Sequence, residues 1–265
     1  MRQVPAQTGH SSSEPETAKN DGTTFLIIGD GRLARHLQAY FRFEAHPYLT
    51  WSRKNSQDSE LKTLAAQATH VLLAVSDSAI TSILERFPFL NEKTCVHFSG
   101  ALVTPLAASA HPLMTFSEQT YTHERYLEVP FVLERGRGKF EDLLPGLRNP
   151  SFEIEAEKKV RYHALCVMSG NFTTLLWEKT FAEFAKLGLP KEVLAPYLVQ
   201  ITENLETSPQ GASVLTGPLV RGDRKTIETH LKELGSDAYA DVYRSFLKAF
   251  ESTQNQEARS EGGIS

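Results

Sequence analysis

Hydrophobic positions along the chain follow two patterns, one in each half. In the first half, apolar runs rich in β-branched and aromatic residues are typical of strands, and they occur at Thr24–Gly29, Tyr48–Ser52, His70–Val75, Thr94–Phe98 and Val129–Leu133. Segments with helical spacing, Arg32–Arg42 and Ser59–Gln67, separate the first three runs. Strands that alternate with helices form parallel βαβ units. The pattern therefore predicts an α/β fold with a Rossmann-type, doubly wound parallel sheet.

The second half has helical spacing almost throughout. Helices are predicted, with glycine and proline residues in the breaks between them, at Glu157–Leu187, Lys191–Thr207, Arg224–Leu234 and Asp237–Phe250. Residues 1–22 and 254–265 have little to bury, so we expect disordered tails there. The predicted organisation is thus a Rossmann domain over residues 23–155 and an all-α domain over residues 156–253.

Charge and cysteine content narrow the class of partner. The chain of 265 residues carries 28 basic and 32 acidic residues, a net charge of −4. Such a balance gives no large positive field for nucleic acid or an anionic membrane, so a small-molecule partner is favoured. Cys95 and Cys166 form neither a disulfide framework nor a metal-binding spacing. We therefore expect no bound metal. Because there is no signal peptide and no apolar run of about 20 residues, we expect a cytoplasmic protein.

A glycine motif joins the first predicted strand to the first predicted helix. The strand runs directly into Gly29-Asp30-Gly31-Arg32-Leu33-Ala34, which has the form GxGxxA. In a dinucleotide fingerprint the first glycine permits a tight turn, the second lets the backbone approach a pyrophosphate, and the third small residue lets helix and sheet pack closely. We therefore predict that all six residues form part of a dinucleotide site, the alternative being a tight turn without a ligand.

The end of the second predicted strand indicates which dinucleotide binds. An NAD enzyme places a carboxylate there for the ribose 2′-hydroxyl, whereas this chain has Ser52, Arg53 and Lys54. Two basic residues favour the 2′-phosphate of NADP(H), although a solvated basic loop would look the same. At the end of the third strand, Val75, Ser76 and Asp77 are predicted to line the cofactor crevice, and Asp77 is equally suited to cap the following helix.

Two polar segments are predicted as loops at the same edge of the sheet. The first holds Ser99 and Gly100, which could offer a hydroxyl and backbone N–H groups to a substrate. The second begins at His111, whose backbone is held extended by Pro112, so its ring could point into the crevice. A plain turn and a structural histidine are the alternatives.

Two further candidates lie in the helical half. His163 and Asn171 are eight positions apart, which places them about a quarter-turn apart on one helix. His163 could protonate a carbonyl oxygen and Asn171 could orient it, unless both are packing residues. Arg221 could bind a substrate carboxylate with its planar guanidinium, or form an ion pair with Asp223, which could also cap the helix that begins at Arg224.

Six ordered motifs resemble those of a bacterial family of Rossmann-like proteins with a C-terminal domain of unknown function. They are GDGRLA, LLAVSDSAI, HFSGAL, HPLMTF, YHALCVMSGNF and LTGPLVRGDRKTIETHL, and they span about residues 24–250. The family is similar in architecture to phosphogluconate dehydrogenase-like, β-hydroxyacid dehydrogenase and pyrroline-5-carboxylate reductase enzymes. Some members are alternative ketopantoate reductases that use NADPH. In the hydroxyacid relatives a lysine precedes an asparagine on the interdomain helix, whereas the matching helix here offers His163.

The resemblance implies an NADPH-dependent oxidoreductase that reduces a small keto acid, with ketopantoate as the leading candidate. It also implies that the helical domain takes part in substrate binding and pairs the chain into a homodimer. Two alternatives remain open at this point: an imine reductase of the pyrroline-5-carboxylate reductase type, and a regulatory protein that binds NADP without catalysis.

Overall fold

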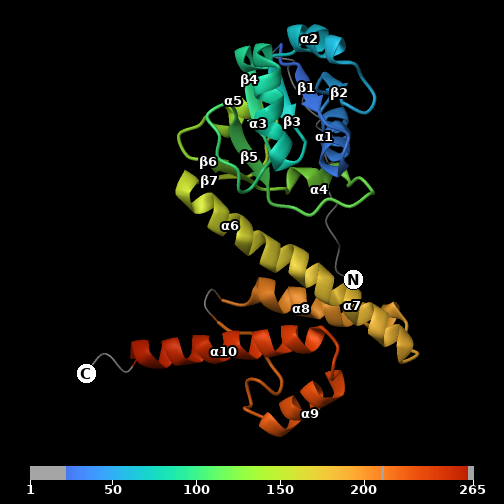
Figure 1. Ribbon diagram of the computed structural model, residues 1–265, viewed down its shortest axis with the longest axis vertical. Coiled ribbons are helices and arrows are strands. Elements are labelled where there is room, and N and C mark those ends of the chain that lie inside the picture. The colour runs from blue at the N-terminus through green and yellow to red at the C-terminus, as the bar shows by residue number, and fades with distance from the viewer. Residues whose placement is uncertain (1–21, 210–211, 262–265) are drawn as a thin grey trace, which may run out of the picture. The chain divides into compact units, whose positions relative to one another are not determined.

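The computed structural model describes residues 22–209 and 212–261, and the chain divides into two compact units between Glu178 and Lys179. The first unit contains a seven-stranded sheet with the order β2-β1-β3-β4-β5-β6-β7 (Figure 1). Its strands are β1 (Phe25–Ile28), β2 (Tyr48–Trp51), β3 (His70–Leu73), β4 (Thr94–His97), β5 (Ala108–Pro112), β6 (Phe131–Glu134) and β7 (Ser151–Ile154). The predicted α/β class and Rossmann-type sheet are confirmed.

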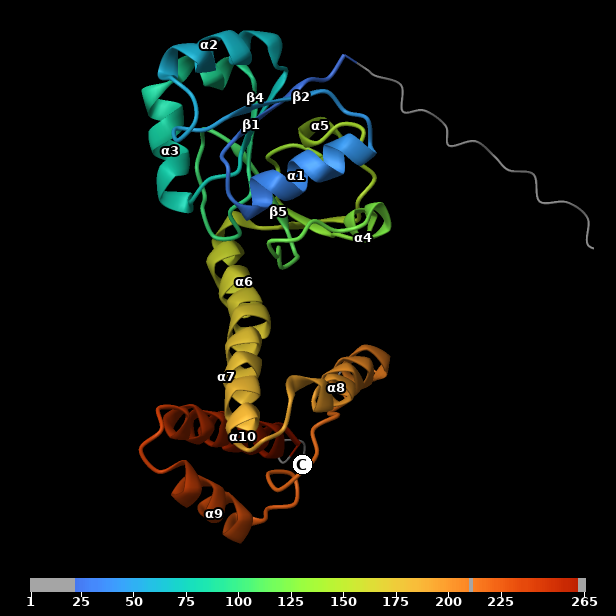
Figure 2. The same ribbon diagram turned by 90° about the vertical axis from the view of Figure 1, so that its right-hand side faces the viewer.

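Helices cover both faces of this sheet because the strands are apolar on both sides. On β1, Phe25 and Ile27 belong to one buried cluster, while Leu26 and Ile28 belong to another. Figure 2 shows α1 and α3 on opposite sides of the strands. The helices of this region are α1 (Arg32–Phe43), α2 (Asp58–Gln67), α3 (Asp77–Arg86), the 3-10 turn η1 (Pro88–Glu92), α4 (His123–Leu127) and α5 (Phe140–Leu143). A strand buried on both faces reads as a continuous apolar run, which explains why β1 was predictable.

Strand β5 departs from the sequence prediction. Residues 108–112 read Ala-Ser-Ala-His-Pro, which lacks the β-branched and aromatic residues that signal a strand. We predicted a loop beginning at His111, but His111 and Pro112 lie inside β5, between β4 and β6. The sheet is also not wholly parallel, because β5 and β6 run antiparallel while the other neighbours are parallel.

The long helical stretch predicted from Glu157 begins where expected but changes geometry midway. After a 3-10 turn, η2 (Ala156–Lys158), it continues as α6 (Lys159–Cys166), a π-helical turn η3 (Val167–Phe172) and α7 (Thr173–Lys186). The two units divide within α7, so α6 and η3 belong to the first unit. π-helical turns insert extra residues into an α-helix and often mark functional sites.

The second unit is helical, as predicted. After the turn η4 (Lys191–Val193) it contains α8 (Ala195–Thr207), α9 (Arg224–Leu234) and α10 (Tyr239–Glu261). We expected a disordered tail from residue 254, but α10 remains helical through Glu261. Residues 262–265, like residues 1–21 of the other expected tail, lie outside the described residues. No helix in the described part of the chain has the length and apolar character needed to cross a membrane.

Candidate functional site

The strand order fixes where a ligand can bind. The chain leaves β1 for β2 on one side and returns to β3 on the other, so the connections diverge at β1. In open α/β sheets, ligands bind at such a switch point, outside the carboxyl ends of the strands. The GxGxxA turn follows the carboxyl end of β1 and therefore lies at this point.

The three small residues of the turn meet different constraints. Gly29 has a φ of 133°, and a Cβ there would lie 2.2 Å from the carbonyl oxygen of Ala74, beyond the end of β3. Gly31 is the N-cap of α1, and a Cβ there would meet nothing within 4 Å. Ala34 is fully buried in the core between α1 and the sheet. The turn therefore needs Gly29 for its own backbone, whereas Gly31 leaves open space beside the helix N-terminus.

The neighbouring strand end supplies unpaired polar groups. Ser52 is 8% exposed, and its hydroxyl oxygen has no hydrogen-bond partner among the described residues. Arg53 and Lys54 follow it in an exposed turn and form no ion pair within the described part of the chain. A buried hydroxyl without a partner carries a desolvation cost that a bound oxyanion would relieve. These residues therefore fit a phosphorylated ligand.

Other residues of the predicted cofactor site are open to solvent. Asp30 and Arg32 are exposed, whereas Leu33 is partly buried. The guanidinium of Arg32 and that of Arg35 both face the Glu118 carboxylate, at 4.0 Å and 2.5 Å. At the end of β3, Val75 is partly buried, and Ser76 and Asp77 are exposed. All of them follow β1 or β3, the two strands at the switch point.

Asp77 joins the first predicted loop instead of capping its own helix. Ser76 occupies the N-cap of α3, and the Ser99 hydroxyl donates to Asp77 Oδ2 at 2.5 Å. The same Ser99 oxygen accepts from the backbone N–H groups of Ala101 and Leu102, at 3.2 and 2.9 Å. The hydroxyl that we predicted for a substrate is thus already used to shape the loop after β4.

A cluster of rings meets at Gly100. A Cβ on Gly100 would lie 2.6 Å from His163 Cδ2 and 3.2 Å from His111 Cδ2, so only glycine fits between the two histidines. Their ring centroids are 5.7 Å apart at an interplanar angle of 85°. A hydrogen bond of 2.7 Å joins His111 Nδ1 and the hydroxyl of Tyr162. The structure therefore brings together three predicted residues, Gly100, His111 and His163, and adds Tyr162.

A buried ion pair lies close to this cluster. Lys159, at the start of α6, is 2% exposed and donates to Leu102 O at 2.5 Å and to Glu134 Oε2 at 3.1 Å. Lysine is almost never fully buried in proteins unless it is paired, so the burial of Lys159 depends on this ion pair. The neighbours of Lys159 in the sequence are mostly charged or polar. They give no sign that this lysine forms an ion pair with a carboxylate on β6. Its burial could be found only from the packing of α6 on the end of the sheet.

The electrostatic environment at this edge disfavours a further positive charge. Burial lowers the pKa of His97, at the end of β4, to about 4, and the charge of Lys159 adds to the effect. Burial likewise lowers the pKa of His111 to about 4, with further contributions from His163 and Lys159. Both imidazoles are therefore neutral at neutral pH. The two nearby carboxylates are already engaged, Asp77 by Ser99 and Glu134 by Lys159.

Asn171 lies in the π-helical turn and is exposed. Eight residues of uninterrupted α-helix would place it about 80° around the axis from His163. The π-helical turn that contains Asn171 changes this angle. A role for Asn171 stays a prediction.

Arg221 lies in the second unit, in the loop before α9, and is exposed. Within the described residues it forms no ion pair with Asp223. Asp223 accepts hydrogen bonds from the backbone N–H and the hydroxyl of Thr226, at 3.1 and 2.7 Å, so it caps α9 as predicted. The proposed role of Arg221 in carboxylate binding stays a prediction.

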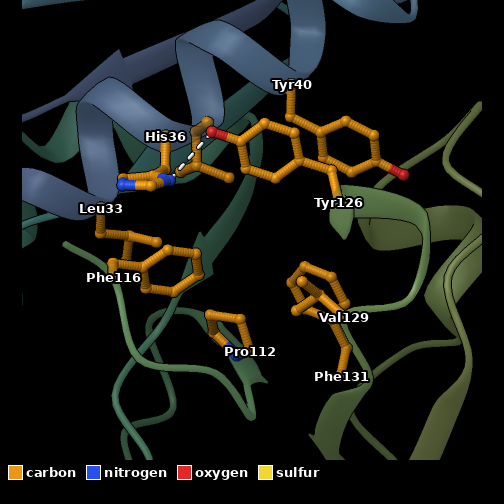
Figure 3. A pocket seen from close by; sticks show the side chains of 9 residues that line it. Leu33, His36, Tyr40, Pro112, Phe116, Tyr126, Val129 and Phe131 are labelled. Carbon is orange, nitrogen blue, oxygen red and sulfur yellow. Dashed lines mark hydrogen bonds between the residues drawn. The ribbon is translucent and has the colours of Figure 1, made fainter. Parts of the chain in front are cut away.

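A small cavity beneath α1 is a separate feature. It has a volume of about 10 Å³, which is at the lower limit for one water molecule. Figure 3 shows it between α1 and the segment around Pro112 and Phe116, with a hydrogen bond of 2.9 Å between His36 Nδ1 and the Tyr126 hydroxyl. His36 Nε2 also lies 2.9 Å from Ser117 O, so both ring nitrogens have partners. This cavity is a gap in an aromatic core and offers no room for a substrate.

Comparison with known proteins supports the fold assignment. Residues 133–249 match the model of a family described as a domain of unknown function, DUF2520. No curated protein sequence matches the chain. A structure from Bacteroides fragilis, described as an NADP oxidoreductase, is 22% identical, with a TM-score of 0.69 over 87% of this chain and 98% of its own.

Two enzyme structures are also similar. A 1-pyrroline-5-carboxylate reductase from Streptococcus pyogenes is 17% identical, with a TM-score of 0.57 over 86% of this chain and 98% of its own. A reductive aminase from Aspergillus terreus, in complex with NADPH and ethyl levulinate, is 16% identical, with a TM-score of 0.55 over 88% of this chain and 94% of its own. The chain therefore has the same fold as these proteins, a Rossmann-type unit followed by helices. The match to DUF2520 begins in the first unit and continues into the second.

Proposed function

We propose that this protein is an NADP(H)-dependent oxidoreductase that reduces the carbonyl group of a small keto acid. The observation that carries the proposal is the Gly29–Ala34 turn at the switch point, next to the strand end at Ser52, Arg53 and Lys54. The descriptions of the similar structures, among them an NADP oxidoreductase and a reductive aminase in complex with NADPH, support the same cofactor.

In this proposal each part of the cofactor site has a distinct task. The open space at Gly31 and the N-terminus of α1 receive the pyrophosphate. Ser52, Arg53 and Lys54 bind the 2′-phosphate that distinguishes NADPH from NADH. NADPH, when bound, would supply the hydride, and the His111 and His163 rings meet at the same edge of the sheet as these residues.

The charges at this edge favour a carbonyl over an imine. Reduction of an imine passes through a cationic iminium, whereas reduction of a carbonyl develops negative charge on oxygen. The ammonium group of Lys159 and the burial of His97 and His111 disfavour a cation there, as the lowered pKa of both histidines indicates. The Asp77 carboxylate acts in the opposite direction and raises the pKa of both histidines, but its contribution is smaller than those of burial and Lys159. Glu134 is paired with Lys159. The imine reductase alternative is therefore the weaker one.

The proposed substrate is a keto acid, and ketopantoate is the first candidate because of the family resemblance. Arg221 is the proposed carboxylate ligand, since its guanidinium is exposed and has no ion-pair partner within the described residues. We also propose that the working form is a homodimer. Within the described part of the second unit only Leu194 and Ala240 are buried hydrophobic residues, so its helices have little apolar core of their own.

Oxidation of NADPH measured against a panel of keto acids and cyclic imines tests this function. We expect turnover with at least one keto acid, and a much lower kcat/KM with imines of similar size. Preference for the imines would contradict the carbonyl assignment. Tight binding of NADPH without turnover of any compound would instead support the non-catalytic regulatory alternative.

A further inference from the structure

Tyr162 is the one member of the ring cluster that sequence analysis did not single out. Its hydroxyl is 2.7 Å from His111 Nδ1, and the two rings meet edge to face, with centroids 5.5 Å apart and an interplanar angle of 83°. Tyr162 comes from α6 and His111 from β5, so the bond ties the helix to the carboxyl edge of the sheet. His163 and Gly100 complete the contact around His111.

The hydroxyl of Tyr162 differs from the other polar groups nearby in its hydrogen-bond partner. Ser99 gives its single proton to Asp77, and Lys159 is engaged with Leu102 O and Glu134. Tyr162 faces an imidazole, which can accept or donate a hydrogen bond according to its tautomer. Burial and the neighbouring Cys166 raise the pKa of Tyr162 above its usual range, so the hydroxyl keeps its proton until a strong base takes it.

We propose that Tyr162 donates the proton that completes carbonyl reduction, and that His111 positions Tyr162 and returns a proton to it from solvent. This inference rests on the proposed function, because it needs a hydride donor and a carbonyl substrate. It assigns the catalytic acid to a tyrosine and gives His111 a supporting role. The expectation from sequence was that His163 itself would protonate the oxygen.

The proton and electron balance is complete with these groups. A hydride from the reduced nicotinamide brings one electron pair to the carbonyl carbon, and the π pair of the C=O bond moves onto the oxygen. The resulting alkoxide takes the proton of Tyr162 Oη, since an alkoxide is a stronger base than a phenolate. His111 then passes its Nδ1 proton to the phenolate oxygen and takes a solvent proton at Nε2. His111 is left as the Nε2–H tautomer, and loss of that proton to solvent with uptake of another at Nδ1 restores its starting form. One solvent proton is consumed overall.

A matched pair of variants tests the donor. In the second unit Tyr243 forms a similar pair with His230, with 3.1 Å between the hydroxyl and Nδ1 and an interplanar angle of 81°, but this pair is exposed. Removal of a general acid lowers turnover by about 10² to 10⁴-fold. We therefore expect Tyr162→Phe to lower kcat by that factor while the KM for the keto acid and the Kd for NADPH stay within about twofold, whereas Tyr243→Phe leaves all three unchanged. Wild-type kcat in Tyr162→Phe would overturn the inference.

Two further measurements keep the test decisive. In protein without cofactor, the ¹⁵N NMR signal of His111 Nδ1 should shift in Tyr162→Phe and stay unchanged in Tyr243→Phe. An unshifted signal in Tyr162→Phe would mean that the hydrogen bond does not exist and would overturn the inference without any activity measurement. If Tyr162→Phe does not fold, His111→Asn offers Tyr162 a hydrogen-bond partner that cannot relay a proton, and kcat should fall with little change in KM. Absence of turnover in the wild type with every carbonyl would refute the proposed function itself.

Discussion

At the scale of single residues, the basic turn after β2 and the buried histidine at the end of β4 carry the most specific expectations. Arg53 has no ion-pair partner among the described residues, so a phosphate would be its first strong partner. His97 is fully buried, and its Nε2 has no hydrogen-bond partner in the described structure, while its Nδ1 accepts from Ser99 N at 3.2 Å. Each side chain predicts a measurable effect.

The cofactor preference should depend on Arg53. Arg53→Glu removes a charge-assisted contact with the 2′-phosphate and adds repulsion, which should weaken NADPH binding by about 10 to 100-fold. NADH binding should change by less than about threefold. Titration of nucleotide fluorescence measures both, and Lys62→Glu, the same charge change at an exposed site on α2, serves as control. Equal losses for NADPH and NADH would contradict a contact with the 2′-phosphate.

The stability of the first unit should fall as the pH is lowered, and His97 should contribute to the fall. The folded state lowers the pKa of His97 to about 4, whereas an unfolded histidine titrates near 6.5. Between about pH 6.5 and 4 the unfolded state therefore binds more protons, and the free energy of unfolding decreases as the pH falls. His97→Asn keeps an acceptor for Ser99 N–H but does not titrate, so the slope in this window should be smaller by up to about 1 kcal/mol per pH unit.

Denaturant unfolding at a series of pH values measures this slope. His111, whose pKa is also lowered to about 4, should leave a residual slope in the variant. Above pH 7 the two proteins should show parallel stability curves, because neither state of either protein gains protons on histidine there. Identical slopes between pH 4 and 6.5 would contradict the buried, neutral state of His97.

At the scale of elements, the turn between β1 and α1 contains residues with different roles in folding and in ligand binding. Gly29 is required by its φ of 133° and by the approach of the Ala74 carbonyl oxygen. Gly31 faces open space and has an ordinary negative φ of −74°. The same motif therefore contains one glycine needed by the fold and one that only a ligand would require.

Substitution of the two glycines by alanine should give opposite results. Gly29→Ala should destabilise the protein by at least about 1–3 kcal/mol, because the backbone is strained and the Cβ overlaps a carbonyl oxygen. Gly31→Ala should change stability by less than about 1 kcal/mol, yet it should weaken NADPH binding at least tenfold by blocking the approach of the pyrophosphate. Thermal unfolding and nucleotide titration on both variants check this. Normal NADPH affinity in Gly31→Ala would mean that the pyrophosphate binds elsewhere.

At the scale of the whole molecule, the helical unit has exposed apolar residues that a second copy could bury. On α8, Val199 and Leu205 are 53% and 62% exposed, and the described residues of this helix include no fully buried side chain. Exposed apolar residues of this kind fit the proposed homodimer. In the sheet unit, Phe152 on the edge strand β7 is 61% exposed and offers a competing surface.

The proposed homodimer should depend on α8. Light scattering should give a mass of twice the chain mass of 29.6 kDa for the wild type. Val199→Glu should shift the population toward the monomer, because an ionised carboxylate is costly to bury. Phe152→Glu should leave the dimer intact. The reverse result would indicate pairing through the sheet edge, and a wild-type monomer at all concentrations would refute the dimer.

Sequence alone determined those features that are encoded locally. The apolar runs of β1 and β3, the glycine turn between β1 and α1, and the helix from Arg224 to Leu234 follow from short-range patterns, and the structure has all of them. Strand β5 was missed because Ala, Ser and His carry little strand signal, and its place depends on hydrogen bonds to β4 and β6. Local propensity cannot report such pairing between distant segments.

Only the tertiary structure decided which side chains meet. The bond between His111 and Tyr162 joins residues 51 positions apart, and the Lys159–Glu134 pair joins residues 25 positions apart. Histidine, tyrosine and lysine occur in many environments, so the residue type alone does not predict the burial of these side chains. The pKa of His111 depends on burial and on neighbouring charges, which exist only after the segments have packed together. The sequence thus predicted a dinucleotide site at the turn between β1 and α1, and the packing of α6 against β5 and β6 decided which groups surround the proposed reaction.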